Sequence, residues 1–236
     1  IWGCNMKIHP FTFLYLFLAY WGHSSYYVAF LLFSILHEIG HYCMALFYRF
    51  EIESVVILPF GAFLSLEDFG LHAPYQEIIM LIMGPFVNLV LGLVFYILEI
   101  NELFEINIFI FLFNLLPIYP LDGSKLLLLF LSYFVNYKKC FQIQIKLSLL
   151  TLSVLFVYTK QIGRKIVIGY LLYQTIVYLK QYSYIYVKTL LNDHLKKKRI
   201  KVNKKMNYYR PYHNLYDLNG KLYDFETIKI YLLKSR

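Results

Sequence analysis

Long apolar segments dominate the first 180 residues of the chain, and short polar breaks separate them. The segments are apolar all round, so helical periodicity does not orient them, and length and helix breakers must define their limits. Six candidate membrane spans result, at roughly residues 10–22, 26–48, 77–99, 105–121, 144–159 and 165–180. A helix needs about 20 apolar residues to cross a bilayer, so the first, fifth and sixth segments are short for this role.

The longest internal connection, residues 51–76, contains two strand-like apolar runs between Val55 and Leu66, joined through Pro59 and Gly61. This pattern predicts a β-hairpin that is pressed against the membrane or dips into it. The hairpin is expected to serve packing, although a strand edge there can also pair with an unwound substrate. We therefore expect an all-α polytopic membrane protein with about six transmembrane helices and a membrane-associated β-hairpin-like loop.

Composition agrees with a membrane location. The 236 residues are 59% hydrophobic and only 16% charged, whereas soluble domains carry about 25% charged residues. The net charge of +9 comes wholly from residues 181–236, because acidic and basic residues balance in residues 1–180. A basic segment beside a membrane favours contact with the anionic lipid of the bilayer, so we expect no nucleic-acid partner.

The chain is expected to have two parts: a six-span membrane core at residues 1–186 and a small basic cytosolic tail at residues 187–236. Asn219-Gly220 predicts a strand-turn-strand in the tail. The basic tail, together with an even number of spans, favours a multi-pass cell-membrane protein with both termini in the cytoplasm. The basic loop at residues 160–164 lies on the opposite side in this topology and speaks against it.

The chemistry of the chain is concentrated in His37-Glu38-Ile39-Gly40-His41, an H-E-x-x-H motif in an otherwise apolar segment. On a helix this spacing places two imidazoles on one face. Ionisable groups inside a membrane segment are costly and indicate a functional site. Two histidines provide two of the three protein ligands of a catalytic zinc, and Glu38 is placed to act as a base. The alternative is a chance match in which the three groups are buried by pairing with one another.

A second polar segment begins within the predicted fourth span, residues 105–121. Pro117 and Pro120 break the helix, Asn114 precedes the break, and Asp122 follows it. Unwound backbone at membrane depth is tolerated where it lines a polar cavity. Asp122 is therefore the candidate third metal ligand, with a helix cap as the alternative.

A third polar position, Asn88, lies in Gly84-Pro85-Phe86-Val87-Asn88 within the third span. We expect Asn114 and Asn88 to bind substrate, or else to form hydrogen bonds between helices.

Three motifs occur in order on hydrophobic segments: H-E-I-G-H at residues 37–41, G-P-x-x-N at residues 84–88, and F-N-x-x-P-x-x-P-L-D-G at residues 113–123. Together they resemble the site-2 protease (M50) family of intramembrane zinc metalloproteases. The resemblance covers roughly residues 5–180. It is closest to the stage IV sporulation protein FB branch, which the motif at residues 113–123 and the segments Lys7–Pro10 and Leu58–Gly61 also resemble.

The resemblance implies six spans and one zinc ion per chain, held by His37, His41 and Asp122. It also implies that Glu38 is the catalytic base and that Asn114 lies near the scissile bond. The implied substrate is a membrane protein or membrane-tethered peptide, such as a pro-sigma or anti-sigma factor, and a regulatory membrane partner is implied as well. The tail is too short for the intact nucleotide-sensing CBS domain of this branch, which makes a truncated CBS-like module one interpretation.

The sequence thus favours an intramembrane zinc metalloendopeptidase that cleaves a membrane segment of a substrate protein. The alternative is a non-proteolytic membrane protein, either a divalent-metal carrier or an inactive family member acting as a chaperone. A carrier is expected to place ionisable pairs on several helices, whereas Glu38 and Asp122 are nearly the only deep acids here. An inactive member usually lacks the base or a ligand, and this chain keeps the whole set.

Overall fold

The computed structural model describes residues 5–8, 25–58, 61–191, 199–203, 207–218, 221–225 and 227. The predicted first span, residues 10–22, lies outside these residues. The chain divides into two compact units, Ile1–Leu116 and Pro117–Arg236, and each unit is described by itself.

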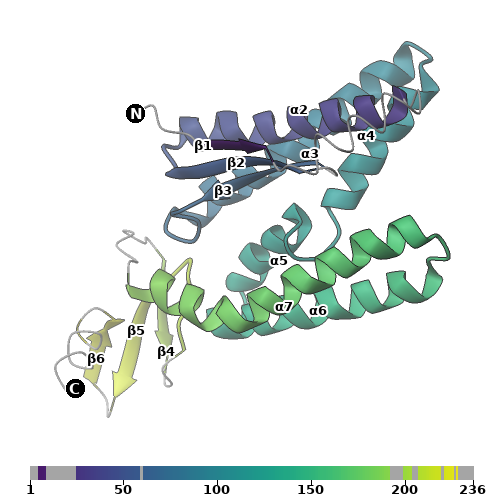
Figure 1. Ribbon diagram of the computed structural model, residues 1–236. Helices are drawn as coiled ribbons and strands as arrows, with labels where there is room; N and C mark the ends of the chain where they lie inside the picture. The colour runs from purple at the N-terminus through teal and green to yellow at the C-terminus, as the bar shows by residue number, and fades with distance from the viewer. Residues whose placement is uncertain are drawn as a thin grey trace. The chain divides into compact units, whose positions relative to one another are not determined.

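Three helices form the frame of the first unit: α2 (Ser25–Phe47), α3 (Pro74–Ile97) and α4 (Asn101–Asn114). Helix α3 packs against both of the others (Figure 1). A proline at its first position starts α3, where a missing backbone N–H costs nothing. The turn into α4 is tight, and Glu99 adopts a left-handed conformation there (φ 58°).

A three-stranded sheet lies beside these helices in the order β1 (Asn5–Ile8), β2 (Ile52–Leu58) and β3 (Gly61–Leu66). Strands β2 and β3 form an antiparallel pair, with Leu58 opposite Gly61. The predicted hairpin is therefore confirmed. Strand β1 pairs with β2 in parallel, which places β3 at the other edge of the sheet, in contact with α2.

The second unit contains α5 (Asp122–Ser132), α6 (Tyr137–Tyr158) and α7 (Ile162–Leu191). Its core is rich in aromatic side chains from these helices. The Asn136 side chain caps α6 by accepting a hydrogen bond from the backbone N–H of Lys138 (3.1 Å), which fixes the helix start.

A second three-stranded sheet follows α7: β4 (Ile200–Asn203), β5 (His213–Leu218) and β6 (Lys221–Asp224). The antiparallel β5–β6 pair confirms the predicted strand-turn-strand. Tyr208 is buried in the helical core, and its carbonyl accepts a hydrogen bond from the N–H of Tyr137 (2.9 Å). This part of the tail is thus packed onto the helices rather than suspended from them.

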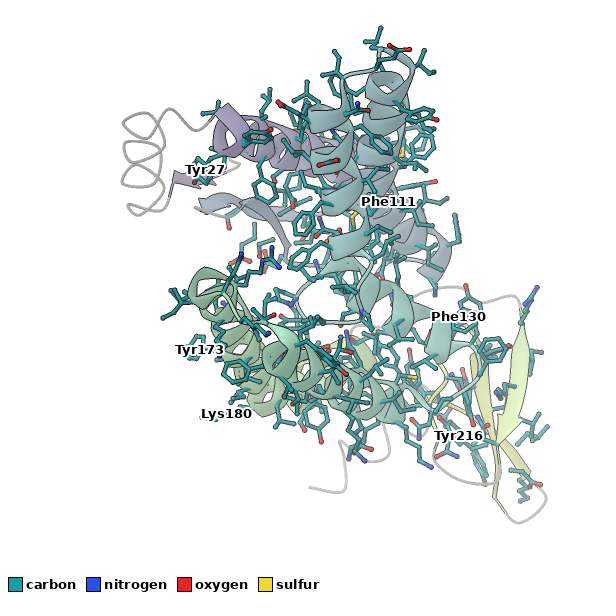
Figure 2. All side chains as sticks on the ribbon, turned by 90° about the vertical axis from the view of Figure 1, so that its right-hand side faces the viewer. Tyr27, Phe111, Phe130, Tyr173, Lys180 and Tyr216 are labelled. Atoms are coloured by element: carbon teal, nitrogen blue, oxygen red, sulfur yellow. The ribbon has the colours of Figure 1, made fainter. Side chains whose placement is uncertain are left out.

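Among the described residues, three helices are long and apolar enough to cross a membrane: Tyr26–Phe47, Pro74–Ile97 and Tyr137–Tyr158. Large apolar side chains are exposed on all three helices, as expected for lipid contact. Helix α3, for example, exposes Ile79, Ile82, Phe86, Val90 and Leu93. Figure 2 shows apolar side chains around the helices, among them the exposed Tyr173 and Phe130.

The structure corrects parts of the sequence-based fold. The protein is mostly helical rather than all-α, because it contains two three-stranded sheets. The segment 105–121 is not one continuous helix: α4 has 14 residues and ends at Asn114, before the two prolines that were predicted to break it. The prediction also missed α5 (11 residues) and ended α7 too early. Six spans were predicted, and three helices of the described residues are long and apolar enough to be spans, so the other three stay predictions.

Candidate metal centre

The two histidines of the H-E-x-x-H motif lie together near the middle of α2. Their spacing of four residues brings His37 and His41 to one face of the helix, where each is only 3% exposed. The rings meet edge to face, and their Nε2 atoms are 3.1 Å apart.

Backbone contact fixes the tautomer of His41. Its Nδ1 lies 2.8 Å from the carbonyl oxygen of Met80 on α3. A carbonyl oxygen only accepts hydrogen bonds, so Nδ1 carries the proton and donates it. The other ring nitrogen, Nε2, is therefore an acceptor that points toward His37.

A chain of amides fixes His37 in the same way. Its Nδ1 lies 2.6 Å from Oδ1 of Asn88 on α3. The Asn88 Nδ2 donates to the Phe33 carbonyl (3.3 Å) and to Oδ1 of Asn107 on α4 (3.1 Å), and Asn107 Nδ2 donates to the Leu103 carbonyl (2.9 Å). Because carbonyl oxygens end the chain, each amide has one orientation, and Nδ1 of His37 must be the donor.

When both rings are neutral, two acceptor nitrogens face each other across 3.1 Å, an arrangement that is repulsive unless a proton or a metal ion lies between them. Zn–N bonds of about 2.0–2.1 Å at a tetrahedral angle place two nitrogens about 3.3 Å apart, close to the separation seen here. Metal-binding histidines usually donate their other N–H to a carbonyl or amide oxygen, as His37 and His41 both do. The donor set thus fits a zinc ion.

Glycines allow α3 to approach the two rings closely. A Cβ atom at Gly84 would overlap Nε2 of His41 and lie 2.7 Å from Nε2 of His37. On α2, a Cβ at Gly40 would lie 2.9 Å from the Met83 carbonyl oxygen. The small residues let the helices pack tightly. At Gly84 the missing side chain also leaves space for a metal in front of the two nitrogens.

Glu38 follows His37 on α2 and is half-buried. One residue corresponds to about 100° of helical rotation, so its carboxylate leaves the helix beside the imidazole face rather than on it. This separation suits a base that accepts a proton next to the metal without occupying a ligand position.

Asp122 belongs to the second unit, where it is the first residue of α5 and is 7% exposed. The structure thus brings His37 and His41 together in the first unit, and the role of Asp122 as their partner stays a prediction. The N-cap residue of α5 is Leu121, and no side chain forms a cap hydrogen bond, so the structure does not bear out the helix-cap alternative for Asp122. At the first helical position its carboxylate interacts favourably with the helix dipole.

The two asparagines predicted to bind substrate have different surroundings. Asn88 is fully buried and forms the hydrogen bonds between helices described above. Asn114 ends α4, is half-buried, and donates from Nδ2 to the Ile110 carbonyl of its own helix (3.0 Å). A substrate contact for either amide stays a prediction.

Sequence reasoning missed Asn107, which is fully buried on α4 and orients Asn88. An available signal was its place in the apolar run Ile106–Phe113, where an amide needs a partner. The carbonyl of Met80 carried no signal, because every residue has one.

Comparison with known proteins identifies the family. The model of "Peptidase family M50" matches residues 25–104. The chain is also 33% identical over 211 residues to stage IV sporulation protein FB of Bacillus subtilis, covering 82% of this chain and 73% of that protein. The chain belongs to peptidase family M50.

Two further similarities agree with this assignment. A zinc metalloprotease of Methanocaldococcus jannaschii is 30% identical over 119 residues, 44% of this chain and 34% of that protein. The solved structure of the site-2 protease from Methanocaldococcus jannaschii has the same fold, with a TM-score of 0.57 and 24% identity over 74% of this chain and 90% of that one. The expected M50 resemblance is confirmed.

We expect Gly84→Ala to reduce zinc binding strongly. The added methyl group needs space that the Nε2 atoms of His37 and His41 occupy, so the imidazoles must move. We expect zinc content after purification to fall below about a tenth of the wild-type value, a loss in the range of disrupted metal surroundings. Gly169→Ala on α7 is the matched control, because nothing lies within 4 Å of a Cβ there. A normal zinc-to-protein ratio in Gly84→Ala would contradict this geometry.

Asn88→Ala tests the amide chain. It removes the acceptor of His37 Nδ1–H and leaves Asn107 Oδ1 without its donor, so the ring loses its fixed tautomer. Such partners typically contribute about 10–100-fold to metal affinity. We expect a zinc dissociation constant raised by about that factor, measured by chelator competition. Asn101→Ala, an exposed position on α4, should leave the constant unchanged.

Proposed function

We propose that this M50 member is an intramembrane zinc metalloendopeptidase that cleaves a membrane segment of a substrate protein. One observation carries the proposal: two buried imidazoles present acceptor nitrogens 3.1 Å apart on an apolar helix, and a carboxylate follows the first of them. Metal held without this acid would suit storage or transport. The acid beside the metal ligands supports hydrolysis.

In this proposal His37, His41 and Asp122 hold one zinc ion. Two neutral imidazoles and one carboxylate are a usual ligand set for a catalytic zinc and leave a coordination position open. When bound, zinc polarises the scissile carbonyl and lowers the pKa of a neighbouring water. Asp122 is the ligand candidate of the second unit because it is buried, acidic and adjacent to the broken segment at Pro117–Pro120.

The remaining chemistry belongs to the side chains of the chain. Glu38 accepts a proton from the attacking water and then donates it to the amine that leaves as the peptide bond breaks. The same carboxylate therefore serves as base and then as acid. Asn114 ends α4 directly before the proline-containing segment, and there we assign it contact with the extended substrate backbone.

The position of the site argues for a membrane-embedded substrate. His37 and His41 lie near the middle of a helix that is long and apolar enough to cross a membrane. A substrate segment must unwind to present a peptide carbonyl there, because helical carbonyls are hydrogen-bonded. Strand β3, at the edge of the first sheet and in contact with α2, offers backbone groups that can pair with an unwound segment. A pro-sigma or anti-sigma factor remains one candidate substrate.

Glu38→Gln tests the proposed reaction. The amide cannot accept the proton of water, whereas His37 and His41 are untouched. We expect a wild-type zinc content with cleavage of a single-span substrate in proteoliposomes reduced by at least about 100-fold, the low end of general acid–base contributions. Gel analysis of the cleaved fragment and metal analysis of the same sample provide the two measurements.

Glu105→Gln, an exposed acid on α4, is the matched control and should cleave normally. Substantial turnover by Glu38→Gln would remove Glu38 from the reaction. Zinc flux into liposomes by a wild-type protein that never cleaves would instead favour the metal-carrier alternative, and binding of a client protein without cleavage would favour the chaperone alternative.

Asp122→Asn tests the third ligand. An amide oxygen is a weaker zinc ligand than a carboxylate, so we expect the zinc dissociation constant to rise by at least about tenfold. Asp224→Asn, a partly exposed acid on β6, should retain wild-type affinity. An unchanged affinity in Asp122→Asn would assign the third ligand to another group while leaving the histidine pair intact.

A further inference from the structure

A buried polar cluster surrounds the segment that leads to Asp122. It comprises Ser124, Gln144, Ser148, Thr175 and Tyr178, all from the second unit. Each is at most 5% exposed, although α6 is apolar enough to cross a membrane. The proposed reaction uses none of these side chains. Their hydrogen bonds converge on residues 117–124, immediately before and after Asp122.

Ser148 holds the part of this segment that precedes Asp122. Its Oγ lies 3.0 Å from the Pro117 carbonyl oxygen and 2.9 Å from the Gln144 carbonyl oxygen, two acceptors for its one proton, and it accepts a hydrogen bond from the N–H of Tyr119 (3.1 Å). Proline leaves the backbone here without helical hydrogen bonds, so these groups need side-chain partners. One buried hydroxyl is therefore within hydrogen-bond distance of two backbone groups of the broken segment, the Pro117 carbonyl and the Tyr119 N–H.

Gln144 holds the part that follows Asp122. It lies one turn before Ser148 on α6, and its Nε2 donates to both the carbonyl oxygen and the Oγ of Ser124 (3.0 and 2.8 Å). Ser124 is in the first turn of α5, two residues after Asp122. The start of α5 is thus fixed to α6 by a side chain that is 1% exposed.

Helix α7 completes the cluster. Thr175 Oγ1 lies 3.2 Å from the Tyr119 carbonyl oxygen, and the Tyr178 hydroxyl donates to Oε1 of Gln144 (3.0 Å). The Tyr178 ring also stacks on Tyr119 at 3.9 Å. The Ser124 carbonyl oxygen only accepts hydrogen bonds, so Gln144 has one amide orientation, with Nε2 toward α5 and Oε1 toward the Tyr178 hydroxyl.

We infer that Gln144 and Ser148 are positioning residues that aim the Asp122 carboxylate for metal binding. The inference rests on the proposed function, in which Asp122 is a zinc ligand. Asp122 lies between two held points, Tyr119 and Ser124, so its backbone has little freedom while both contacts persist. Groups that orient a ligand typically affect metal affinity as well as activity. Gln144 and Ser148 would then act on Asp122 as Asn88 acts on His37.

Two variants of the full chain in detergent test this inference: Ser148→Ala and Gln144→Leu. The readouts are the zinc dissociation constant from chelator competition and the visible absorption of the cobalt-substituted protein, whose intensity reports tetrahedral geometry. We expect zinc binding weakened by at least about tenfold and a weaker cobalt spectrum in both. Thermal melting of the helical signal identifies variants that are unfolded.

Matched controls come from the same helix. Ser153→Ala removes an exposed hydroxyl that bonds the carbonyl one turn earlier, and Gln142→Leu removes an exposed amide. Both should bind zinc and cobalt as the wild type does. Ser148→Thr keeps the hydroxyl and should restore affinity relative to Ser148→Ala. If either main variant does not fold, Tyr178→Phe decides, because it removes only the donor to Gln144 and should weaken zinc binding several-fold.

The outcomes separate this inference from the proposed function. Suppose that Asp122→Asn loses zinc, whereas the folded variants Ser148→Ala and Gln144→Leu keep wild-type affinity and spectrum. The positioning role is then overturned and the protease proposal stands. Tyr178→Phe replaces either of these two variants that does not fold. If Asp122→Asn also keeps wild-type affinity, the ligand assignment and the positioning role are both overturned. A loss of stability with unchanged zinc affinity and cobalt spectrum would show a purely structural role and would also overturn the inference.

Discussion

The first unit is organised around two buried imidazoles whose acceptor nitrogens face each other at 3.1 Å. In an apolar helix this arrangement costs free energy twice, through desolvation and through repulsion of the two acceptors. The hydrogen bonds to Met80 and Asn88 offset the first cost, and a shared cation offsets the second. Zinc supplies that cation in the proposed enzyme, so the fold of α2 and α3 prepares a site that metal binding completes.

The surroundings of this pair follow from the same demand. Asn88 needs a partner for its second N–H, Asn107 provides it, and the chain ends at a backbone carbonyl. Every polar group added to hold the ring requires another, until a carbonyl of α4 ends the series. The contact also requires α3 to lie close to α2, which is why Gly84 and Gly40 stand where a methyl group would overlap a neighbour. The orientation of the His37 and His41 rings therefore depends on the close packing of α2 against α3.

The sequence predicted the parts that breakers and motifs define. Pro59 predicted the turn of the β2–β3 hairpin, and Asn219-Gly220 predicted the β5–β6 pair. The lengths of the apolar segments predicted the helices that contain His37 and Asn88. Helix α5 was missed because it follows Pro117 and Pro120 and has only 11 residues, too few to be detected as a membrane span by apolar length. In the site, the motif predicted His37 and His41, but which nitrogen of each ring is left for the proposed metal depends on Met80 and Asn88, which only folding brings near.

In both units, hydrogen bonds from buried polar side chains orient a candidate metal ligand. In the first, an amide chain that ends on carbonyls orients imidazoles; in the second, Gln144 and Ser148 hold the backbone on both sides of Asp122. In both places the buried polar side chains come from apolar helices, where burying an amide without hydrogen-bond partners would cost free energy. Small apolar helices in lipid gain little from hydrophobic packing against each other. Directional hydrogen bonds from buried amides and hydroxyls can therefore hold the proposed metal ligands in the orientation that metal binding requires.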